Sequence, residues 1–405
     1  MRILTVTSLY PNAAQPNHGI FVENRMARVH ATGRAEVTVI APVPWFPSTA
    51  RVFGSYADLA RVPVREERRG IRIEHPRYGT IPKVGMRVQP ALYHAALARC
   101  ARQLIAETGP FDLIDAHYFY PDGVAAARLA DALDLPLTIT ARGTDINLIP
   151  TVSETATRAI LAAADRAEAS ITVCEALRAE MIGMGADGGR IHTLRNGVDL
   201  DAFRPPGVDR ASLKHALGVP GDAPLAVSVG GLVERKGHHL TIDAVAATPG
   251  LHLRIAGAGP ERDALAARIE AMGVGDRVRL SGSLPHAALA DFYGAADFSV
   301  LSSSREGWAN VLLESMACGT PVVATDAWGT PEVIAAYEAG HLATRNAADI
   351  GVQIARLMAD MPRRAATRAY AERFSWDDTV EGVLCVFGEV VGERAGRSVS
   401  RASAP

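Results

Sequence analysis

The stretch Ser302-Ser-Ser-Arg-Glu306-Gly307-Trp308-Ala309-Asn310-Val-Leu-Leu-Glu314-Ser-Met-Ala-Cys-Gly319-Thr-Pro321-Val-Val-Ala324 decides the fold class. It follows a short apolar run, Phe298–Leu301, which predicts a buried strand. We expect a polar loop through Glu306, a helix from about Asn310 that stops at Gly319, and a second strand over Val322–Ala324. A strand, a helix and another buried strand in this order predict a parallel sheet that is covered by helices.

The same alternation extends in both directions from this stretch. Short apolar runs predict further strands at Arg2–Ser8, Glu36–Ala41, Leu113–Ala116, Leu137–Thr140, Ala169–Val173, Leu225–Val229, Leu251–Ala256 and Val278–Ser281. Amphipathic stretches predict helices at Phe21–Ala31, Pro90–Glu107, Gly123–Ala132, Thr155–Ala164, Leu240–Ala247, Glu261–Ala271, Ala287–Ala295 and Asp377–Val391. The chain is therefore expected to be α/β throughout.

The alternation pauses once, in a segment rich in turn-forming residues that ends in a Pro pair and predicts an interdomain linker. Two α/β domains of similar size follow from this. Because parallel sheets bind ligands at the carboxyl ends of their strands, two facing domains would form a deep cleft. The predicted organisation is a first domain, a linker, a second domain, a C-terminal helix and a small polar tail that we expect to be disordered, with the bounds 1–196, 197–206, 207–375, 376–393 and 394–405.

Composition narrows the range of partners. The chain has 405 residues and a formal net charge of −2, which disfavours nucleic-acid binding through phosphate neutralisation. Residues 51–103 nevertheless carry eleven Lys or Arg against four Asp or Glu. This stretch could dock on an anionic membrane leaflet, or it could simply be a solvated face. The four cysteines lie far apart and predict buried thiols in a reducing compartment. The start of the chain is unlike a signal peptide and no long apolar run occurs, so we expect a cytoplasmic protein, either free or peripheral on the inner face of the cell membrane.

The chemistry of Ser302–Ala324 points to a phosphate next to hydroxyl groups. Backbone N–H groups at the start of its helix lack partners and suit a phosphate. Glu306 lies in the loop and Glu314 about two turns into the helix, so the two carboxylates could meet hydroxyls along one extended ligand. The alternative is that both are solvated charges at a helix end. Carboxylates beside a phosphate site favour a nucleotide sugar.

These positions closely resemble the Glu-x7-Glu signature of the family-4 retaining glycosyltransferases, which have the two-domain GT-B fold. The matching residues are Glu306-Gly-Trp, Asn310, Leu313-Glu314, Met316-Ala-Cys-Gly, Pro321-Val-Val and Gly329-Thr-Pro-Glu-Val-Ile334. The resemblance implies two Rossmann-like domains that face each other across a cleft, and a C-terminal helix that crosses back to the first domain. It also implies donor binding by residues of this segment, namely Gly307, Trp308, Ala309, Asn310 and Glu314.

The opening of the second domain extends the resemblance. Val227-Ser-Val-Gly-Gly231-Leu-Val-Glu-Arg235-Lys236-Gly237 is similar to the family's loop with a basic pair, and Leu253-Arg-Ile-Ala-Gly257 to the turn that borders the base pocket. Donor binding by Arg235, Lys236 and Gly257 is implied. Most members carry Arg where this chain has Gly231, so one cation for the diphosphate is missing.

Three segments of the first domain also resemble the family. His18-Gly19 follows the first strand, where the family's Gly loop meets donor phosphate or acceptor, and His117 matches a His that contacts the transferred sugar. Arg142-Gly-Thr-Asp145 is similar to a His-Gly-x-Asp motif, in the form found in bacterial cell-surface polysaccharide transferases of the teichuronic-acid type. Arg142 could replace the missing cation or bind an acidic acceptor, with His18 and Asp145 on the acceptor side. An ion pair with Asp145 would explain Arg142 equally well.

The resemblance implies transfer of a sugar, with retention, from a nucleotide-diphosphate donor to a hydroxyl of a glycan, a lipid-linked glycan or a similar acceptor in cell-surface polysaccharide or glycolipid biosynthesis. Glu306, His117 and Lys236 are the expected catalytic residues. No metal and no cofactor are expected, because basic residues and helix amino ends can stabilise the leaving diphosphate. A nucleotide-sugar epimerase of the same fold and a non-catalytic sugar-nucleotide-binding partner are the alternatives.

Overall fold

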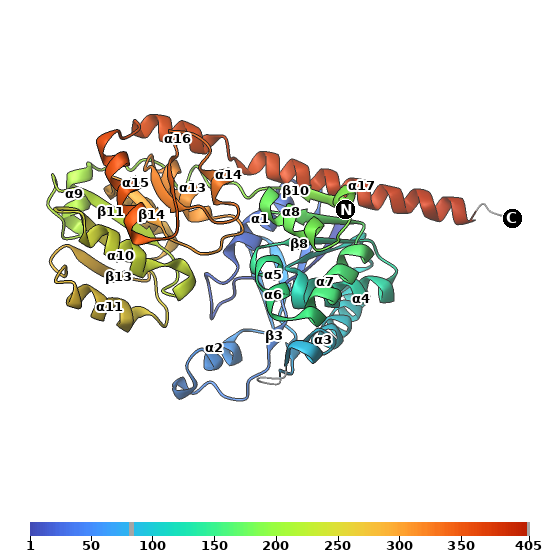
Figure 1. The fold of residues 1–405 in the computed structure, drawn as a ribbon. Coiled ribbons are helices and arrows are strands. Elements are labelled where there is room, and N and C mark those ends of the chain that lie inside the picture. The colour runs from blue at the N-terminus through green and yellow to red at the C-terminus, as the bar shows by residue number, and fades with distance from the viewer. Residues whose placement is uncertain (81–84, 403–405) are drawn as a thin grey trace. The chain divides into compact units, whose positions relative to one another are not determined.

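The computed structural model describes residues 1–80 and 85–402 and divides the chain into two compact units (Figure 1). Unit 1 consists of Met1–Arg195 and the C-terminal segment from Asp377, and unit 2 of Asn196–Trp376. Each unit is built on a parallel sheet with helices around it, which confirms the predicted fold class.

The sheet of unit 1 has the strand order β10-β9-β8-β7-β1-β2-β5-β4 and is parallel except for the antiparallel pair β4 and β5 at one edge. The two short strands β3 and β6 pair with each other separately. The strands are β1 (Arg2–Val6), β2 (Glu36–Ile40), β3 (Val43–Pro44), β4 (Arg65–Arg68), β5 (Ile71–Glu74), β6 (Arg77–Tyr78), β7 (Leu113–His117), β8 (Leu137–Ala141), β9 (Ala169–Thr172) and β10 (Ile191–Thr193).

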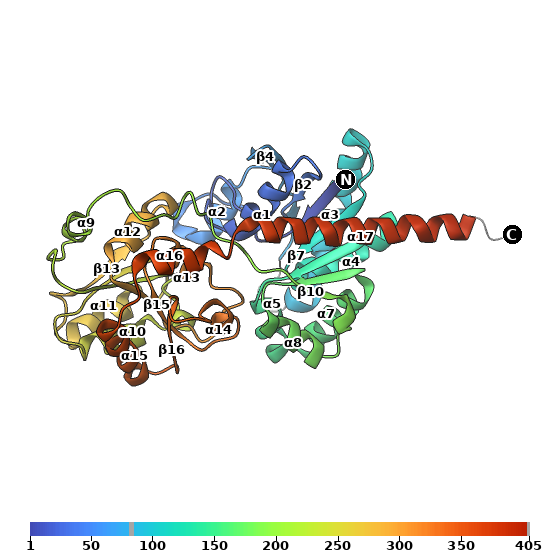
Figure 2. The ribbon, with the colours of Figure 1, turned by 90° about the horizontal axis from the view of Figure 1, so that it is seen from above.

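The helices of unit 1 are α1 (Ile20–Ala31), α2 (Ser55–Arg61), α3 (Gly85–Thr108), α4 (Val124–Leu133), α5 (Thr144–Asn147), α6 (Ile149–Val152), α7 (Glu154–Arg166), α8 (Glu175–Gly183) and α17 (Trp376–Ala402), with short helical turns at Arg51–Phe53 (η1), Phe119–Gly123 (η2) and Gly188–Arg190 (η3). α17 lies beside α1, as Figure 2 shows, and the two helices pack with β1, β2 and β9 in one apolar cluster. The C-terminal helix therefore belongs to the first unit, as the resemblance implied.

Unit 2 has a fully parallel sheet with the strand order β13-β12-β11-β14-β15-β16. Its strands are β11 (Leu225–Val229), β12 (His252–Ala256), β13 (Val278–Gly282), β14 (Phe298–Leu301), β15 (Val322–Thr325) and β16 (Gly340–Ala343). Its helices are α9 (Arg210–Ala216), α10 (His238–Ala246), α11 (Arg262–Ala271), α12 (Leu289–Ala295), α13 (Asn310–Ala317), α14 (Thr330–Val333), α15 (Ala347–Ala359) and α16 (Arg364–Glu372), with short turns at Glu234–Lys236 (η4) and His286–Ala288 (η5).

Some expectations differ from the structure. α17 continues to Ala402, whereas a disordered tail was predicted from residue 394; no proline interrupts the helix before that point, and residues 403–405 lie outside the described ranges. Cys385 is exposed on α17 rather than buried. In the basic stretch 51–103, residues 81–84 are likewise outside the described part of the chain.

Candidate active site

The carboxyl ends of two neighbouring strands in unit 2 bring a carboxylate and a cation together. β11 pairs with β14, so the η4 turn after β11 lies beside the loop after β14. The Lys236 Nζ atom is 2.6 Å from the Glu306 Oε1 atom, and the Arg235 Nη1 atom is 3.4 Å from the same oxygen. Arg235 also donates a hydrogen bond of 2.7 Å to the carbonyl oxygen of Arg305, which holds it against this loop. Parallel pairing thus joins two motifs that lie 70 residues apart.

The Glu306 side chain is 8 % exposed and remains ionised. Burial raises the pKa of this carboxyl, but the adjacent Lys236 and Arg235 cations outweigh burial and hold the pKa below its ordinary value. One carboxylate oxygen is engaged by the cations. The other can accept hydrogen bonds from ligand hydroxyls.

Glycines set the shape of the neighbouring loop. A Cβ atom on Gly257 would lie 1.9 Å from the carbonyl oxygen of Gly230, so the loops after β11 and β12 approach too closely for any other residue. Gly231 differs, because it is exposed and a Cβ atom there would meet only the carbonyl oxygen of Ala258, at 3.8 Å. The position where the resemblance implied an Arg is therefore open space in this chain.

The amino end of α13 faces the same loop. No side chain caps the helix at Ala309, and the N–H groups of Asn310 and Leu312 donate to the carbonyl oxygens of Trp308 and Ala309, at 3.1 and 3.0 Å. Donor binding at this helix end stays a prediction. Glu314 lies one to two turns further along the helix. Its Oε2 atom accepts a hydrogen bond of 3.4 Å from the Tyr293 hydroxyl, and its Oε1 atom is 3.8 Å from the His286 Nε2 atom. Burial, followed by the Glu314 charge, raises the pKa of Tyr293 well above 10, so this hydroxyl stays a donor.

Trp308 lies just before α13, and the donor binding predicted for this helix start stays a prediction. It is buried, its indole N–H donates a hydrogen bond of 2.9 Å to the carbonyl oxygen of Asn196, and its ring centroid lies 6.0 Å from that of Phe374. Asn310 accepts a hydrogen bond of 3.3 Å from the Asn196 side chain. The loop is thus fastened to the first residue of unit 2, and Trp308 can reach a ligand only through its backbone.

In unit 1, His117 lies at the end of β7 and Arg142 just after the end of β8, and these two strands pair. An Arg142 Nη2 atom lies 2.5 Å from the His117 Nδ1 atom. Since a guanidinium only donates, Nδ1 accepts and the ring proton belongs on Nε2, which lies 2.9 Å from Asp115 Oδ2. Burial, assisted by the Arg142 cation, lowers the pKa of His117 to about 4 despite Asp115, so the ring is neutral near pH 7.

The sugar contact predicted for His117 stays a prediction, and the geometry adds a second role. The side chain is 1 % exposed and both ring nitrogens face protein groups. His117 also orients the Arg142 guanidinium, whose central carbon lies 5.5 Å from the centroid of the Phe21 ring. Burial, followed by the nearby Arg25 cation, lowers the pKa of Arg142.

Asp145, which was predicted on the acceptor side, holds together the loop that carries Arg142. It is fully buried, and its carboxylate accepts backbone N–H groups from Phe119 at 2.8 Å, Arg142 at 3.0 Å and Gly143 at 2.8 Å. Burial raises its pKa although these bonds oppose the shift. The Asp145 charge also acts on Arg142, whose pKa it raises against the larger lowering by burial.

Gly19 begins α1 with φ of +68°. A Cβ atom there would lie 2.2 Å from the carbonyl carbon of Leu9, so the close approach that this glycine permits is to the chain itself. His18 is exposed and its Nε2 atom lies 3.0 Å from the carbonyl oxygen of Ser8. Of the two, His18 is the side chain within reach of a ligand.

Asp122 was not among the residues predicted to be functional. The residue is fully buried, accepts hydrogen bonds from the Tyr93 hydroxyl at 2.7 Å, the Ser8 hydroxyl at 3.0 Å and the Ser8 N–H, and so ties η2 to α3 and to the end of β1. Burial outweighs these donors and raises its pKa to about 7. The Pro121-Asp122-Gly123 turn was its only sequence signal, and turns of this kind are common.

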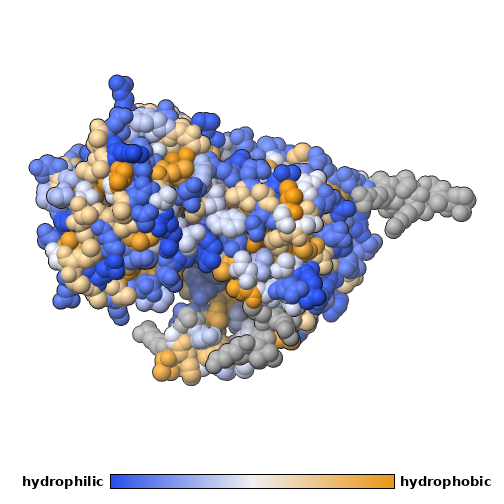
Figure 3. Space-filling view, in the orientation of Figure 1, coloured by the Kyte–Doolittle hydropathy of each residue, from blue (hydrophilic) through white to orange (hydrophobic). Residues whose placement is uncertain are grey.

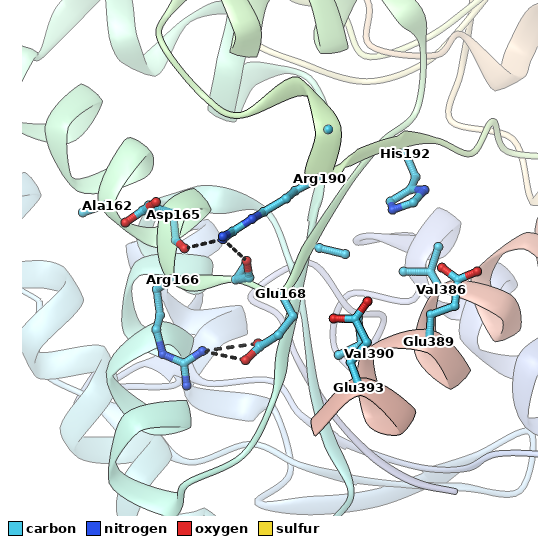
Figure 4. A pocket seen from close by; sticks show the side chains of 13 residues that line it. Ala162, Asp165, Arg166, Glu168, Arg190, His192, Val386, Glu389, Val390 and Glu393 are labelled. Atoms are coloured by element: carbon cyan, nitrogen blue, oxygen red, sulfur yellow. Dashed lines mark hydrogen bonds and ion pairs between the residues drawn. The ribbon is translucent and has the colours of Figure 1, made fainter. Parts of the chain in front are cut away.

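A cavity of about 720 Å³ lies at the opposite edge of the unit 1 sheet, at the amino-terminal ends of β9 and β10 and beside α17 (Figure 4). Its charged walls are largely paired. The Arg190 Nη1 atom donates to the carbonyl oxygens of Asp165 and Ala167, and Arg166 lies 3.3 Å from Glu168. This cavity is remote from the strand ends that carry the candidate site.

Two features are absent from residues 1–80 and 85–402, the ranges that the structure describes. No three His, Cys, Asp or Glu side chains there gather as metal ligands would. Likewise, none of the helices in these ranges combines the length and the apolar character that a bilayer crossing needs.

Both units match families of known proteins. Residues 25–202 match the family model "Glycosyltransferase Family 4" and residues 209–374 match "Glycosyl transferases group 1". The chain is 28 % identical over 341 residues to a putative teichuronic acid biosynthesis glycosyltransferase, TuaC, of Bacillus subtilis, covering 84 % of each chain. It is 32 % identical over 375 residues to a D-inositol 3-phosphate glycosyltransferase of Xylanimonas cellulosilytica, covering 85 % of this chain and 88 % of that one.

Solved structures share the fold. A sucrose-phosphate synthase from Thermosynechococcus elongatus superposes with a TM-score of 0.74 at 20 % identity, covering 99 % of both chains. HepE of Anabaena in complex with UDP superposes with a TM-score of 0.74 at 22 % identity, covering 96 % of this chain and 100 % of that one. These neighbours have the GT-B fold, which confirms the architecture that the resemblance implied.

Proposed function

The chain belongs to the glycosyltransferases of family 4 with a group 1 second domain, and from this premise we propose that it transfers a sugar from a nucleotide-diphosphate donor with retention and without a metal ion. The acceptor we propose is a hydroxyl of a glycan or lipid-linked glycan in cell-surface polysaccharide or glycolipid biosynthesis. The buried Lys236–Glu306 pair beside the amino end of α13 carries this proposal.

Each protein group at the strand ends of unit 2 suits one part of a nucleotide-sugar donor. Lys236 and the first N–H groups of α13 suit the diphosphate, since both present positive charge to an anion. The remaining oxygen of Glu306 suits hydroxyls of the transferred sugar, and Glu314 suits those of the ribose. UDP in HepE supports a nucleoside diphosphate as the ligand class to test first.

We propose attack on the same face from which the diphosphate leaves. The anomeric C–O bond to phosphate breaks, a new bond forms to the acceptor oxygen, and the acceptor proton passes to the leaving phosphate oxygen. The cations against Glu306 lower its nucleophilicity, which disfavours a covalent intermediate of the kind used by retaining hydrolases. Lys236 and the helix amino end stabilise the leaving charge, the task that a metal ion performs elsewhere. Undiminished turnover in EDTA is the expected result.

On the unit 1 side we propose that Arg142 binds an anionic group of the donor or acceptor. The support is its position after β8, with a guanidinium oriented by neutral His117. Arg142→Ala should raise a Michaelis constant by roughly tenfold or more, as expected for a lost charged hydrogen bond. Unchanged Michaelis constants for both substrates would overturn this role.

We propose that the reaction takes place at the inner face of the cell membrane, with the protein as a peripheral component. Ionic attraction to that surface has limited support, because Arg65, Arg68 and Arg72 of the basic stretch pair with carboxylates of unit 1, namely Glu74, Glu23 and Glu107. An exposed charge that is already paired adds little to docking.

A thermal-shift panel of nucleotide sugars that includes UDP-glucose tests the proposed function. A donor at 100 times its dissociation constant adds about 2.7 kcal/mol and raises the melting temperature. The shifted donor is then incubated with acceptor and the anomeric configuration of the product is determined. No shift with any nucleotide sugar would overturn the proposal. Interconversion of the sugar without acceptor would identify an epimerase instead, and acceptor-dependent release of nucleoside diphosphate would rule out a non-catalytic role.

A further inference from the structure

An apolar cluster projects from unit 1 between β3 and β4. Trp45, Val52, Phe53 and Tyr56 are 58 %, 85 %, 48 % and 59 % exposed, and we call these four side chains the aromatic projection. Figure 3 shows apolar surface over the segment that carries α2, the helix labelled in Figure 1. Single exposed apolar residues are ordinary, but four on a stretch of twelve residues mark an interaction surface.

The projection is an ordered cluster rather than a loose loop. The Phe46 ring lies between its neighbours, with centroid distances of 5.4 Å to Phe53 and 5.4 Å to Tyr56. The other side of this segment is fixed to unit 1 by the buried Ala57 and Val62. The rings are therefore held outward while the backbone is anchored, which keeps the rings from packing into the core of the unit.

The projection leaves unit 1 at the edge where the candidate acceptor groups lie. β3 follows the carboxyl end of β2, and it pairs with β6, which follows the carboxyl end of β5. Since these strands are parallel to β7 and β8, that edge is the one reached by His117 and Arg142. A surface bound by the projection would thus lie on the acceptor side.

We propose that the aromatic projection inserts into the interfacial layer of a lipid bilayer and so presents a lipid-linked acceptor to the strand ends of unit 1; this rests on the proposed function. Trp and Tyr rings favour the headgroup level of a membrane, because one part of each ring is apolar and one part is polar. The segment 43–64 has a single acidic residue, Asp58, against Arg51 and Arg61, so its sign suits an anionic leaflet.

Two observations favour insertion into a membrane over contact with a second copy of the chain and over purely ionic docking. A stable interface with a second copy of the chain would bury roughly 20–30 residues on each side, far more than four side chains offer. Purely ionic docking would need free cations, but Arg61 already lies 2.9 Å from Asp58 and donates to the carbonyl oxygen of Thr49. Insertion of rings is driven by apolar burial and is therefore only weakly sensitive to salt.

Flotation with vesicles of phosphatidylglycerol and phosphatidylcholine tests the proposal on the full-length protein. The variant Trp45→Ser/Phe53→Ser/Tyr56→Ser should lower the vesicle partition coefficient by about tenfold or more. The matched control Tyr337→Ser, which removes a ring that is 49 % exposed in unit 2, should leave it unchanged. Raising the salt from about 0.1 M to about 1 M should lower wild-type binding less than about threefold, although the Debye length falls from ~10 to ~3 Å.

The fluorescence of Trp45 provides a second measurement of insertion. Trp308 and Trp376 are buried and Trp328 in unit 2 is half-buried, so a blue shift of tryptophan emission on adding vesicles should come mainly from the exposed Trp45. Trp45→Phe should abolish the shift while flotation persists. Equal flotation of the triple variant, release at high salt, or absence of flotation would overturn the proposal, as would a triple variant that converts a dimer to a monomer.

Nucleotide-sugar thermal shifts, measured on the same samples, distinguish a failure of the membrane proposal from a failure of the proposed function. A donor that stabilises a protein which does not float leaves the proposed function standing and removes only the membrane inference. The triple variant should keep the wild-type donor shift, which also shows that it is folded.

Discussion

At the scale of single residues, Glu306 combines two properties that usually exclude each other, since it is buried and yet ionised. Its pKa lies below the ordinary value only because the Lys236 and Arg235 cations outweigh burial. Glu306→Gln keeps the volume and removes the charge. We expect sugar transfer to fall by at least about 100-fold, because a charged hydrogen-bonding group at the reacting sugar is lost. Initial rates at saturating donor measure this.

The same substitution should also destabilise unit 2, by about 3 kcal/mol, because Lys236 is left without its carboxylate. A carboxyl whose folded pKa is depressed stabilises the fold above its unfolded pKa, near 4.5, and loses this contribution as pH falls through the folded pKa. The stabilities of variant and wild type should therefore converge as pH falls below 4.5 and through the depressed pKa of Glu306. Glu234→Gln, on the same turn but exposed, is the control. Loss of transfer by both variants equally would contradict the assignment.

Gly231 is the second residue at which we predict the effect of a substitution on donor binding. Its open surroundings and ordinary φ leave room for a long side chain, so Gly231→Arg should fold normally. The added guanidinium lies near Lys236 and should lower the Michaelis constant for the donor by about threefold to tenfold, as a charge-assisted bond to phosphate would. Gly231→Gln is matched in size but neutral and should have little effect. A tighter-binding Gln variant, or a weaker-binding Arg variant, would show that the diphosphate lies elsewhere.

At the scale of elements, local patterns were sufficient for much of the fold. The strand Phe298–Leu301 and the helix Asn310–Ala317 have the predicted bounds, because an apolar run and a helix that stops at a glycine are local properties. The hairpin of β4 and β5 was missed, since Arg65–Arg68 carries a charge at every position and shows no apolar alternation. Its charges are satisfied by residues that are distant in sequence, such as Glu23.

For the candidate site, the sequence predicted which loops are involved but not the directions of all their side chains. Motif spacing identified the loops that hold Glu306 and Lys236, and parallel pairing brought them together. The direction of a side chain depends on neighbours that no local pattern specifies. Trp308 turns to the carbonyl of Asn196, and Asp145 turns to backbone N–H groups between residues 119 and 143.

Asp122 joins three elements and provides a pH-dependent test of unit 1. Its pKa is about 7 in the fold against 3.8 in a free chain, so the folded state retains a proton that the unfolded state releases. For a raised pKa, the associated stability is fully present below pH 3.8 and is lost as pH rises through about 7. The loss is on the order of 4 kcal/mol over this window. Asp122→Asn should remove it.

The measurement is the urea unfolding free energy of wild type and Asp122→Asn between pH 5 and pH 8, a range within which most carboxylates do not titrate. We expect the difference between the two proteins to change as pH rises from 5 to about 7 and then to level off. Tyr93→Phe, which deletes one donor to Asp122, should shift the wild-type transition to higher pH, because that bond stabilises the charged form. A difference that does not vary with pH would show that Asp122 is ionised throughout.

At the scale of the whole molecule, the order of the chain and the composition of the units do not coincide. Unit 2 is one continuous segment, but unit 1 needs both ends of the chain. α17 contributes Val383, Leu384 and Phe387 to the cluster that β1, β2 and α1 form. A chain that ends before residue 377 would leave that apolar cluster open to water. The C-terminal helix is thus a structural part of unit 1 rather than an appendage.

This connectivity predicts that one substitution on α17 acts selectively on unit 1. Phe387 is fully buried, and Phe387→Ala should cost about 3–5 kcal/mol through lost burial and the cavity left behind. Unit 1 should then unfold at lower urea concentration, while the transition that donor stabilises, assigned to unit 2, stays in place. Gly388→Ala, at the next position, where a Cβ atom would meet nothing within 4 Å, should instead be neutral or stabilise slightly. If Phe387→Ala moved the donor-sensitive transition as far as the other, the two units would unfold as one cooperative body, and α17 would be the element that couples them.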